Sequence, residues 1–373
     1  MAGIYVHIPF CRKRCAYCDF HFSTTFNNYR HRLIKAIVLE LILRKEEIID
    51  SVETIYFGGG TPSILNEEEL LLILNTIRNQ YKVKSYAEVT LEANPEDLNE
   101  NQISQWRNAG INRLSIGLQS FKSEDLKWMN RAHELEQGSC AVESAKQSGF
   151  SNISVDLIYG LPGLTLEDWQ THLQRVVAMG VTHISAYCLA VEKRTALNHL
   201  VKTGKIKTAN EESQVAQFNL MLRYLLENGY HQYEISNFSK KGMESKHNTA
   251  YWQNKPYLGV GPSAHSFNGS IRRWNVYNNT KYYKGVGKND DWYKVENLTI
   301  NDKWNELFLT GLRTTWGVSK EHLNELGGLT KNEQDLAETL IKKKLLIETP
   351  QCFILSSSGK LQADGIATSF FRV

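Results

Sequence analysis

The sequence predicts an α/β protein whose core is a partial, open (β/α)6 barrel, followed by a small C-terminal α+β unit. Six short runs rich in β-branched and aromatic residues alternate with helical stretches along the first half of the chain, which is the pattern of parallel strands joined by crossover helices. Six such units fall short of the eight that close a full barrel. Glycines and polar side chains follow the runs, as expected where strand ends build a site. A flat, doubly wound sheet is the alternative.

The predicted elements follow from this alternation, and turn residues end most of the runs. The strands are GIYVHI at 3–8, ETIYF at 53–57, AEVTLE at 87–92, NRLSIG at 112–117, ISVDLIYG at 153–160 and HISAYCLA at 183–190. The helices between them are expected at about 27–47, 67–79, up to 109, 123–148 and 167–179. Each helix is long enough to carry the chain back across a sheet, so neighbouring strands can be parallel.

Two changes of pattern divide the chain into three predicted parts. The barrel core is expected at 1–240, an extension at 241–299, and a C-terminal domain at 300–373. An amphipathic helix at about 210–227 lies near the end of the first part, and Gly229 follows it as a stop signal. The last part combines helical runs with a small β-hairpin.

Composition and charge restrict the class of protein. The chain has 373 residues, of which 42% are hydrophobic and 22% charged, as in soluble globular proteins. No apolar run approaches the roughly 20 residues that span a bilayer, and the N-terminus MAGIYVHIPF lacks the pattern of a signal peptide. We therefore expect a cytoplasmic protein, in a reducing compartment where cysteines seldom form structural disulfides. The net charge of +3 argues against a dedicated nucleic-acid binder, so no nucleic-acid partner is expected.

Half of the chain's six cysteines lie within eight residues, in the stretch HIPFCRKRCAYCDF. Cys11, Cys15 and Cys18 have C-x3-C-x2-C spacing, and three thiolates so close on a loop can converge on one soft metal centre. A tetrahedral zinc site needs a fourth ligand, which His21 could supply. A [4Fe–4S] cluster held by three cysteines leaves one iron open to an external ligand. The spacing favours the cluster, and the zinc site stays open as the alternative.

Residues suited to binding a ligand lie at the ends of the predicted strands, at the edge where α/β barrels place their chemistry. After the second strand, GGGT at 58–61 lets the backbone approach a ligand closely and offers N–H groups to an anion. The other strand ends contribute Glu92, Gln119, Asp156 and Ala190. Taken singly, a glycine run can be a tight turn and a carboxylate can be a structural ion pair, so the joint placement carries the prediction.

Several blocks of the sequence, taken in order, resemble one family. They are YVHIPFCRKRCAYC, YFGGGTPSIL, TLEANPEDL, NRLSIGLQSF, NRAHE, VDLIYGLPGLT and GVGPSAHSF, and together they cover nearly the whole chain. The chain resembles the oxygen-independent coproporphyrinogen III oxidase family of the radical S-adenosylmethionine (SAM) proteins. The resemblance implies a radical SAM barrel with a small winged-helix-like C-terminal domain. With the charge near balance, that domain is expected to face a protein or to act as a lid.

The same resemblance implies a cofactor set and the residues that hold it. Cys11, Cys15 and Cys18 would bind a [4Fe–4S] cluster whose fourth iron is chelated by SAM. Tyr17 would pack beside the cluster or SAM, and His7, which matches a histidine close to the cluster, is the candidate catalytic residue. The positions that match SAM contacts in the family are Tyr5, Gly59, Gly60, Thr61, Glu92, Gln119, Arg131, Asp156 and Ala190.

The family that the chain resembles has two branches. One decarboxylates two propionates of coproporphyrinogen III, and the other, the HemW branch, binds haem and delivers it to acceptor proteins. Phe20 stands where the oxidases carry a fourth cysteine, and the first strand begins almost at Met1, where they have a long extension. HNTAYW at 247–252 matches the HNxxYW pattern of the chaperones, and His265 stands where the oxidases have an apolar residue. These departures favour a haem chaperone, with the oxidase as the alternative.

The HNxxYW block places the predicted haem-binding residues in the part at 241–299. His247 could ligate haem iron, while Tyr251 and Trp252 offer planar faces to the macrocycle. The ordinary alternatives are a structural histidine and core packing. The basic loop at 12–14 could meet the propionates, or it could be a solvated surface run.

These interpretations define the expected ligands and partners. We expect haem or a porphyrin as ligand and a haem-acceptor protein as partner, with a membrane-associated acceptor and a homodimer as further candidates. Coproporphyrinogen oxidase activity is expected to be absent, while SAM cleavage stays open as a regulatory or haem-release step. A third hypothesis, unrelated to haem or SAM chemistry, is a zinc-stabilised binding protein. Such a protein would be colourless, whereas an iron–sulfur protein is brown.

Overall fold

The core of the protein is one large sheet, seen in a computed structural model that describes residues 2–288 and 291–373. Its twelve strands have the order β12-β11-β10-β9-β1-β2-β3-β4-β5-β6-β8-β7. Six neighbours are parallel: β1 Ala2–Ile8, β2 Val52–Gly59, β3 Val83–Ala93, β4 Arg113–Gln119, β5 Asn152–Tyr159 and β6 His183–Cys188. Because β1 also pairs with β9 and β6 with β8, the six strands do not close on themselves. The predicted α/β class with an open parallel core is confirmed.

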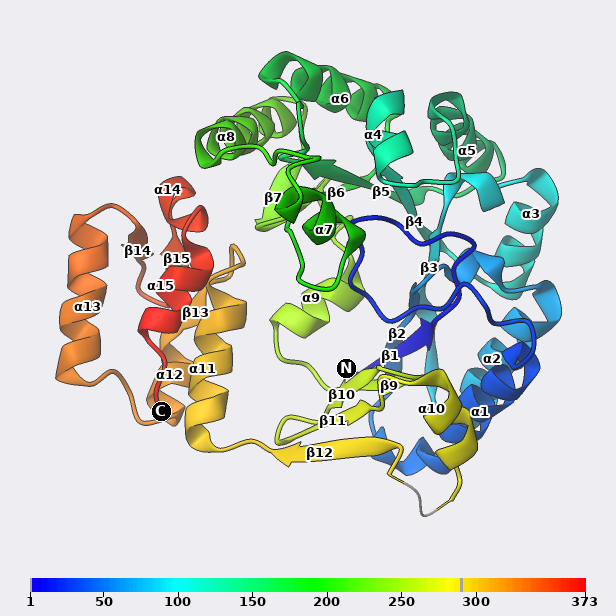
Figure 1. Cartoon of the computed structure of the whole chain (residues 1–373). Helices are drawn as coiled ribbons and strands as arrows, with labels where there is room; N and C mark the ends of the chain where they lie inside the picture. Colours follow the sequence, from blue (N-terminus) through cyan, green and yellow to red (C-terminus); the bar gives the residue numbers. More distant parts are fainter. Residues whose placement is uncertain (1, 289–290) are drawn as a thin grey trace.

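Helices cover the outer side of the sheet in an arc, while the cysteine loop, drawn in dark blue, runs across the inner side (Figure 1). They are α1 Arg30–Leu43, α2 Glu67–Gln80, α3 Glu100–Ala109, α4 Ser123–Trp128, α5 Leu135–Gln147, α6 Leu166–Ala178 and α8 Glu211–Glu227. The short helix α7 Ala196–Lys202 lies on the inner side, where the N–H of Leu197 donates to the carbonyl oxygen of Ala16 in the cysteine loop. Among the described residues, no helix is both long and apolar enough to cross a membrane.

One helix is shorter than the sequence predicts. The helix expected at 27–47 begins only at Arg30 and ends at Leu43, and a short 3-10 turn, η1 Lys45–Glu47, follows it. The helical stretches expected at 123–148 are two helices, α4 and α5, and the chain turns between them through Asn130, whose φ is +59°. The turn places Arg131 at the cavity described below.

Alternation along the parallel strands separates an apolar face from a polar one. In β1 the side chains of Ile4, Val6 and Ile8 are fully buried in the main hydrophobic core. The residues between them, Tyr5 and His7, make polar contacts on the opposite face. The other strands follow the same rule, with polar side chains on that face at Thr54, Tyr56, Glu92, Ser115, Ser154, Asp156, His183 and Ser185. The sheet therefore presents polar groups to the inner side.

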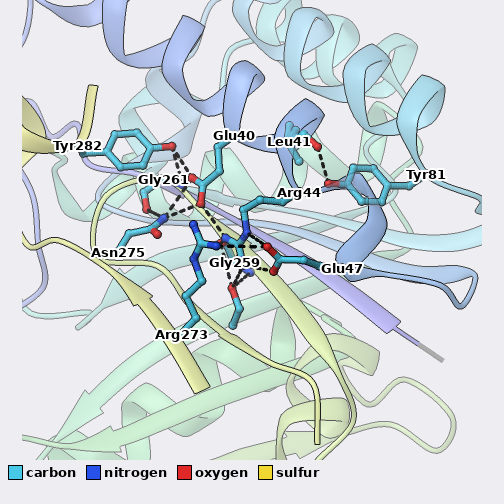
Figure 2. Close-up of polar contacts among 11 residues, drawn as sticks. Glu40, Leu41, Arg44, Glu47, Tyr81, Gly259, Gly261, Arg273, Asn275 and Tyr282 are labelled. Atoms are coloured by element: carbon cyan, nitrogen blue, oxygen red, sulfur yellow. Dashed lines mark hydrogen bonds and ion pairs between the residues drawn. The ribbon is translucent and has the colours of Figure 1, made fainter. Parts of the chain in front are cut away.

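The part at 241–299 continues the same sheet. β9 Tyr257–Val260 lies parallel to β1, and β10 His265–Phe267, β11 Ile271–Asn275 and β12 Tyr293–Asn297 follow in antiparallel order. Helix α9 Lys246–Trp252 packs against β1 and β2, and α10 Asn279–Gly285 packs against α1. A buried polar network centred on Glu40 and Arg44 joins α1 to β9, β10 and β11 (Figure 2).

The C-terminal residues form a unit with a hydrophobic cluster of its own. It contains α11 Ile300–Gly311, β13 Val318–Ser319, α12 Lys320–Glu325, α13 Lys331–Lys342, β14 Leu346–Glu348, β15 Cys352–Leu355, α14 Ser357–Lys360 and α15 Ala363–Ser369. The expected hairpin is the pair β14–β15, and the short β13 adds a third antiparallel strand. Trp304, Phe308 and Phe370 are buried in this cluster, while Arg313 binds Glu234 beside the large sheet.

Candidate functional site

A cavity of about 680 Å³ lies between the cysteine loop and the carboxyl ends of the parallel strands. Twelve residues singled out from the sequence line it: Cys11, Cys15, Tyr17, Cys18, Gly59, Gly60, Thr61, Glu92, Gln119, Arg131, Asp156 and Ala190. They come from the cysteine loop, from β2 to β5 and from the segments that follow the strands. The folded chain therefore brings together residues that are up to 179 positions apart, from Cys11 to Ala190.

Backbone hydrogen bonds hold the cysteine loop over the strand ends. The N–H of Cys11 donates to the carbonyl of Ser23 (3.1 Å), and the N–H of Ala16 donates to that of Met129 (2.9 Å). Two donors approach the sulfurs: Thr61 Oγ1 lies 3.4 Å from Cys11 Sγ, and Arg131 Nη1 lies 3.5 Å from Cys15 Sγ. Burial raises the pKa of the Cys11 thiol to about 12, so a metal centre must displace its proton to bind.

The side chains around the cysteine loop distinguish between a zinc ion and a [4Fe–4S] cluster, the two metal centres that the spacing left open. Among the described residues, no three His, Cys, Asp or Glu side chains are gathered as one metal ion requires. His21, the proposed fourth zinc ligand, holds Asn279 Oδ1 at 2.7 Å from its Nε2. In an iron–sulfur cluster held by three cysteines, each thiolate binds a different iron, so the sulfurs need not converge on one point. The geometry fits a cluster better than a zinc ion.

Arg131 is a buried cation with one donor unused. Its Nη2 donates to Asn94 Oδ1 and to the carbonyl of Gly117, both at 2.8 Å, and its Nη1 lies 3.5 Å from Cys15 Sγ. Burial disfavours its charge, but neighbouring acidic groups, Tyr17 first among them, raise its pKa above the ordinary value. Its Nε is buried and has no hydrogen-bond partner within the described chain. A ligand carboxylate at this position would satisfy a buried donor.

Two carboxylates face the cavity from β3 and β5, the strands on either side of β4. Glu92 accepts hydrogen bonds from the Tyr56 hydroxyl (2.8 Å) and from the backbone N–H of Gly59 (3.2 Å), and Asp156 accepts one from Ser115 Oγ (3.2 Å). Burial raises the pKa of Glu92 to about 7 and that of Asp156 to about 6. Both can accept from an amine or from sugar hydroxyls, and a cationic ligand would favour their ionised forms.

The glycines after β2 are required by close packing. Gly59 has φ +109°, and a Cβ there would lie 2.5 Å from the ring of His7. A Cβ on Gly60 would lie 2.7 Å from the carbonyl oxygen of Phe10. The backbone of this turn can therefore lie directly over His7 and against the cysteine loop, which a larger residue would prevent.

Tyr5 and His7 lie beneath the floor of the cavity and do not line it. The Tyr5 hydroxyl is 3.1 Å from His7 Nδ1, and His7 Nε2 is 2.9 Å from the carbonyl oxygen of His21. Burial lowers the pKa of His7 to about 4, so its ring is neutral at physiological pH. These contacts let both residues support Gly59 and the cysteine loop.

The residues predicted to bind haem lie apart from the cavity. His247 is 1% exposed, with Nδ1 at 2.7 Å from Thr54 Oγ1 and Nε2 at 2.9 Å from the Tyr251 hydroxyl. Burial lowers the pKa of His247 to about 3. The Trp252 ring lies beneath the guanidinium of Arg313, and the exposed His265 stacks on Trp274. In this conformation neither nitrogen of His247 is free to bind iron.

The three basic residues at 12–14 make different contacts. Arg12 binds Asp97 through Nε and Nη2 at 3.0 and 2.8 Å, and Asp97 is 1% exposed, so this cation is already neutralised. Lys13 lines the large cavity, and Arg14 donates to the backbone carbonyl of Arg194. The pairing of Arg12 could not be predicted from the sequence, because Asp97 is 85 residues away.

Several cavity residues were not singled out from the sequence. They are Asn94, Ser115, Ile158, Tyr187, Cys188, Leu189 and Glu192, among others. Tyr187 and Cys188 end β6, and Ser115 lies in β4 beside Asp156 in β5. The rule that strand ends carry the chemistry would have found these three. It could not have found Glu192, which lies in a loop.

Comparison with known proteins gives a consistent result. The family described as the Radical SAM superfamily matches residues 5–176. The chain is 34% identical over 376 residues to the heme chaperone HemW of Bacillus subtilis, with 99% of both chains covered. It is 33% identical over 370 residues to the heme chaperone HemW of Mycobacterium tuberculosis, with 98% of this chain and 93% of that one covered.

One solved structure shares the fold over nearly the whole chain. It is the coproporphyrinogen III oxidase HemN from Escherichia coli, described as a radical SAM enzyme, with a TM-score of 0.85 at 22% identity. The match covers 99% of this chain and 90% of that one. At this identity the likeness establishes the fold alone.

Proposed function

Because the chain belongs to the HemW family within the radical SAM superfamily, we propose that it is a haem chaperone, which binds haem and passes it to acceptor proteins. The observation that carries this proposal is the identity of 31–34% to several proteins of that name over nearly the full length. Phe20 supports it, because a coproporphyrinogen oxidase would be expected to have a cysteine there. Membership of the superfamily implies a [4Fe–4S] cluster and SAM as cofactors.

The proposed cofactor site assigns a task to each group of the cavity. Cys11, Cys15 and Cys18 would hold the cluster, and the unused Nε of Arg131 would take the carboxylate of SAM. Glu92 would accept from the SAM amine or ribose and Asp156 from a ribose hydroxyl, in their ionised forms. When bound, the cluster and SAM supply one-electron chemistry. The chain's own part is to bind and orient SAM and to shield it from water.

His247 as iron ligand stays a prediction within this proposal. Both of its ring nitrogens are engaged, so haem ligation requires the Thr54 and Tyr251 contacts to open. Tyr251 and Trp252 could pack against the macrocycle only in such an opened state. The acceptor protein, membrane-associated or not, and a homodimer are also part of the proposal, to be checked by haem-transfer assays and by sedimentation.

The alternative is an oxygen-independent coproporphyrinogen III oxidase, the second branch of the family that the sequence resembles. One anaerobic experiment separates the two functions. The cluster-loaded protein is titrated with haem, and a parallel sample receives coproporphyrinogen III, SAM and a reductant. The expected result is a saturable Soret complex that passes its haem to apomyoglobin, with no protoporphyrinogen formed. Turnover to protoporphyrinogen would overturn the chaperone proposal, and so would a protein that does not bind haem.

A further inference from the structure

A second, smaller pocket of about 380 Å³ adjoins the large cavity. The two share Cys18, Asp19, Phe20 and Phe22, so they are separated only by the end of the cysteine loop. Beyond these residues, the smaller pocket is lined by Arg14, Arg194 and Tyr277 and by the segment 23–25. The function proposed above assigns no task to this pocket.

Two arginines give the smaller pocket an excess of positive charge. Arg14 Nη2 donates to the carbonyl oxygen of Arg194 at 3.2 Å, so the two residues are in direct contact. In the part of the chain that the structure describes, neither guanidinium has a carboxylate within ion-pair distance. Arg12 differs, because Asp97 already holds it. Asp19 is the one acidic residue that lines the pocket, so two cations face one anion.

Aromatic faces flank the two cations. The side chain of Phe20 is 71% exposed and that of Tyr277 57% exposed, which is unusual for such large rings in a concave site. The Tyr277 hydroxyl donates to the backbone carbonyl of Asp19 at 3.3 Å, and its ring packs on His21 with centroids 4.3 Å apart. These contacts fix the ring in place, while Phe20 stands between the two cavities.

We propose that this pocket binds the carboxylate edge of haem, with Arg14 and Arg194 pairing with the two propionates and Phe20 and Tyr277 contacting the macrocycle. The inference rests on the proposed haem-binding function and names the site for it. A planar ligand with two carboxylates on one edge matches two neighbouring guanidiniums beside exposed rings, because guanidinium and carboxylate form paired, charge-assisted hydrogen bonds. The macrocycle would then lie beside the cluster loop, at the mouth of the large cavity.

The test compares variants of the cluster-loaded, full-length protein by equilibrium titration. The variant R14E/R194E reverses both charges, and K127E/K343E makes the same change of formal charge at two other exposed positions. Each protein is titrated with haem and with haem dimethyl ester, in which both propionates are neutral, and the Soret band is followed. SAM binding is measured in parallel, because neither arginine lines the SAM cavity.

The expected result is a loss of haem affinity by roughly tenfold or more in R14E/R194E and almost none in K127E/K343E. Esterification should weaken binding to the wild type by a similar factor. In R14E/R194E it should not weaken binding further, because the two glutamates repel charged propionates and the ester removes that repulsion. R14K/R194K, which keeps the charges, should recover part of the affinity. SAM affinity should stay unchanged in all variants.

Three results would overturn the proposal, and they differ in whether the proposed chaperone function is overturned with it. Unchanged haem affinity in R14E/R194E would remove this pocket and leave the chaperone function standing. Equal affinity of the wild type for haem and its ester would exclude the propionates as the recognised groups. Failure of the wild type to bind haem would overturn both the pocket and the chaperone function. If R14E/R194E loses SAM binding through misfolding, R194Q alone is put through the same comparison.

Discussion

Two buried arginines of this protein, Arg44 and Arg131, differ in whether the chain itself supplies a partner to every guanidinium nitrogen. In the network around Glu40 and Arg44, every nitrogen of the Arg44 guanidinium has an acceptor, and the Glu40 carboxylate accepts from Asn275, Gly261 and other groups (Figure 2). In the cavity, Arg131 keeps an unused Nε. A guanidinium whose nitrogens are all bonded within the chain indicates a structural tie, whereas Arg131 keeps a buried free donor at a cavity, which indicates a place for a ligand.

The difference is also visible in position. Arg44 and its partners lie between α1 and the strands β9 to β11, where they join the parallel core to the extension. Arg131 lies at the cavity formed by the carboxyl ends of the parallel strands and the cysteine loop. Burial of a polar group is therefore no evidence of function by itself. A buried donor indicates a ligand site when it has no partner in the chain and also lines a cavity, as Arg131 does.

The largest effect is expected from removing Glu40, the buried ion-pair partner of Arg44. Glu40→Ala leaves Arg44, whose side chain is 3% exposed, without its buried partner, and should lower the free energy of unfolding by about 3–5 kcal/mol. Chemical denaturation followed by circular dichroism measures it. Glu47→Ala is the matched control, because Glu47 binds the same guanidinium from a half-exposed position, and it should cost about 1 kcal/mol or less. A small loss in Glu40→Ala would show that the network contributes little to stability.

A change at the unsaturated cation should act on ligand binding more than on folding. Arg131→Lys removes the planar donor set and should weaken SAM binding to the cluster-loaded protein by roughly thirtyfold, about 2 kcal/mol. Equilibrium binding of SAM measures the effect. Arg12→Lys is the control, since Arg12 is held by Asp97 and does not line the cavity. Equal SAM affinity in wild type and Arg131→Lys would contradict the assigned role.

Both ring nitrogens of His247 have partners within the chain, as the nitrogens of Arg44 do. Its substitution tests whether the ring is structural. His247→Ala leaves Thr54 and Tyr251 without their shared partner and should cost about 1–3 kcal/mol of unfolding free energy. Haem affinity should remain that of the wild type if the ring serves packing alone. Loss of haem binding at unchanged stability would instead establish His247 as a ligand. His265→Ala, at an exposed position, should change stability by about 0.5 kcal/mol or less.

The smallest effect is a dependence on pH that Glu92 introduces. Because burial raises its pKa to about 7, the ligand-free folded protein binds this proton more tightly than the unfolded chain does. The resulting stabilisation is complete below the ordinary carboxyl pKa and is lost as pH rises through about 7. The difference in unfolding free energy between wild type and Glu92→Gln should therefore change across this window, and a constant difference would contradict it.

SAM binding should show the opposite dependence on the same proton. An amine or hydroxyl donor needs the ionised carboxylate, so SAM affinity should rise as pH increases through about 7 in the wild type. Glu92→Gln should bind SAM more weakly and without that rise. Affinities measured between about pH 6 and pH 8 decide the question.

Much of the fold could be predicted because it depends on local patterns. The six parallel strands follow from apolar runs separated by helical stretches, and their predicted ranges overlap the observed ones, as in 153–160 against Asn152–Tyr159. The position of the break between the helical stretches at 123–148 was not predicted, because a left-handed residue such as Asn130 leaves no periodic signal. Pairing of β9 with β1 was missed for a related reason, since a four-residue strand far away in the chain carries no mark of its neighbour.

The sequence by itself determined the class of fold, the spacing of the three cysteines and the set of residues that end the strands, because each depends on neighbours in the chain. Only the tertiary structure decided which of those residues are free to act. It paired Arg12 with Asp97 and left Arg14 beside Arg194 without a carboxylate. It engaged both nitrogens of His247 and left one donor of Arg131 open. Such pairings join residues far apart in the chain, so only the packed structure contains them.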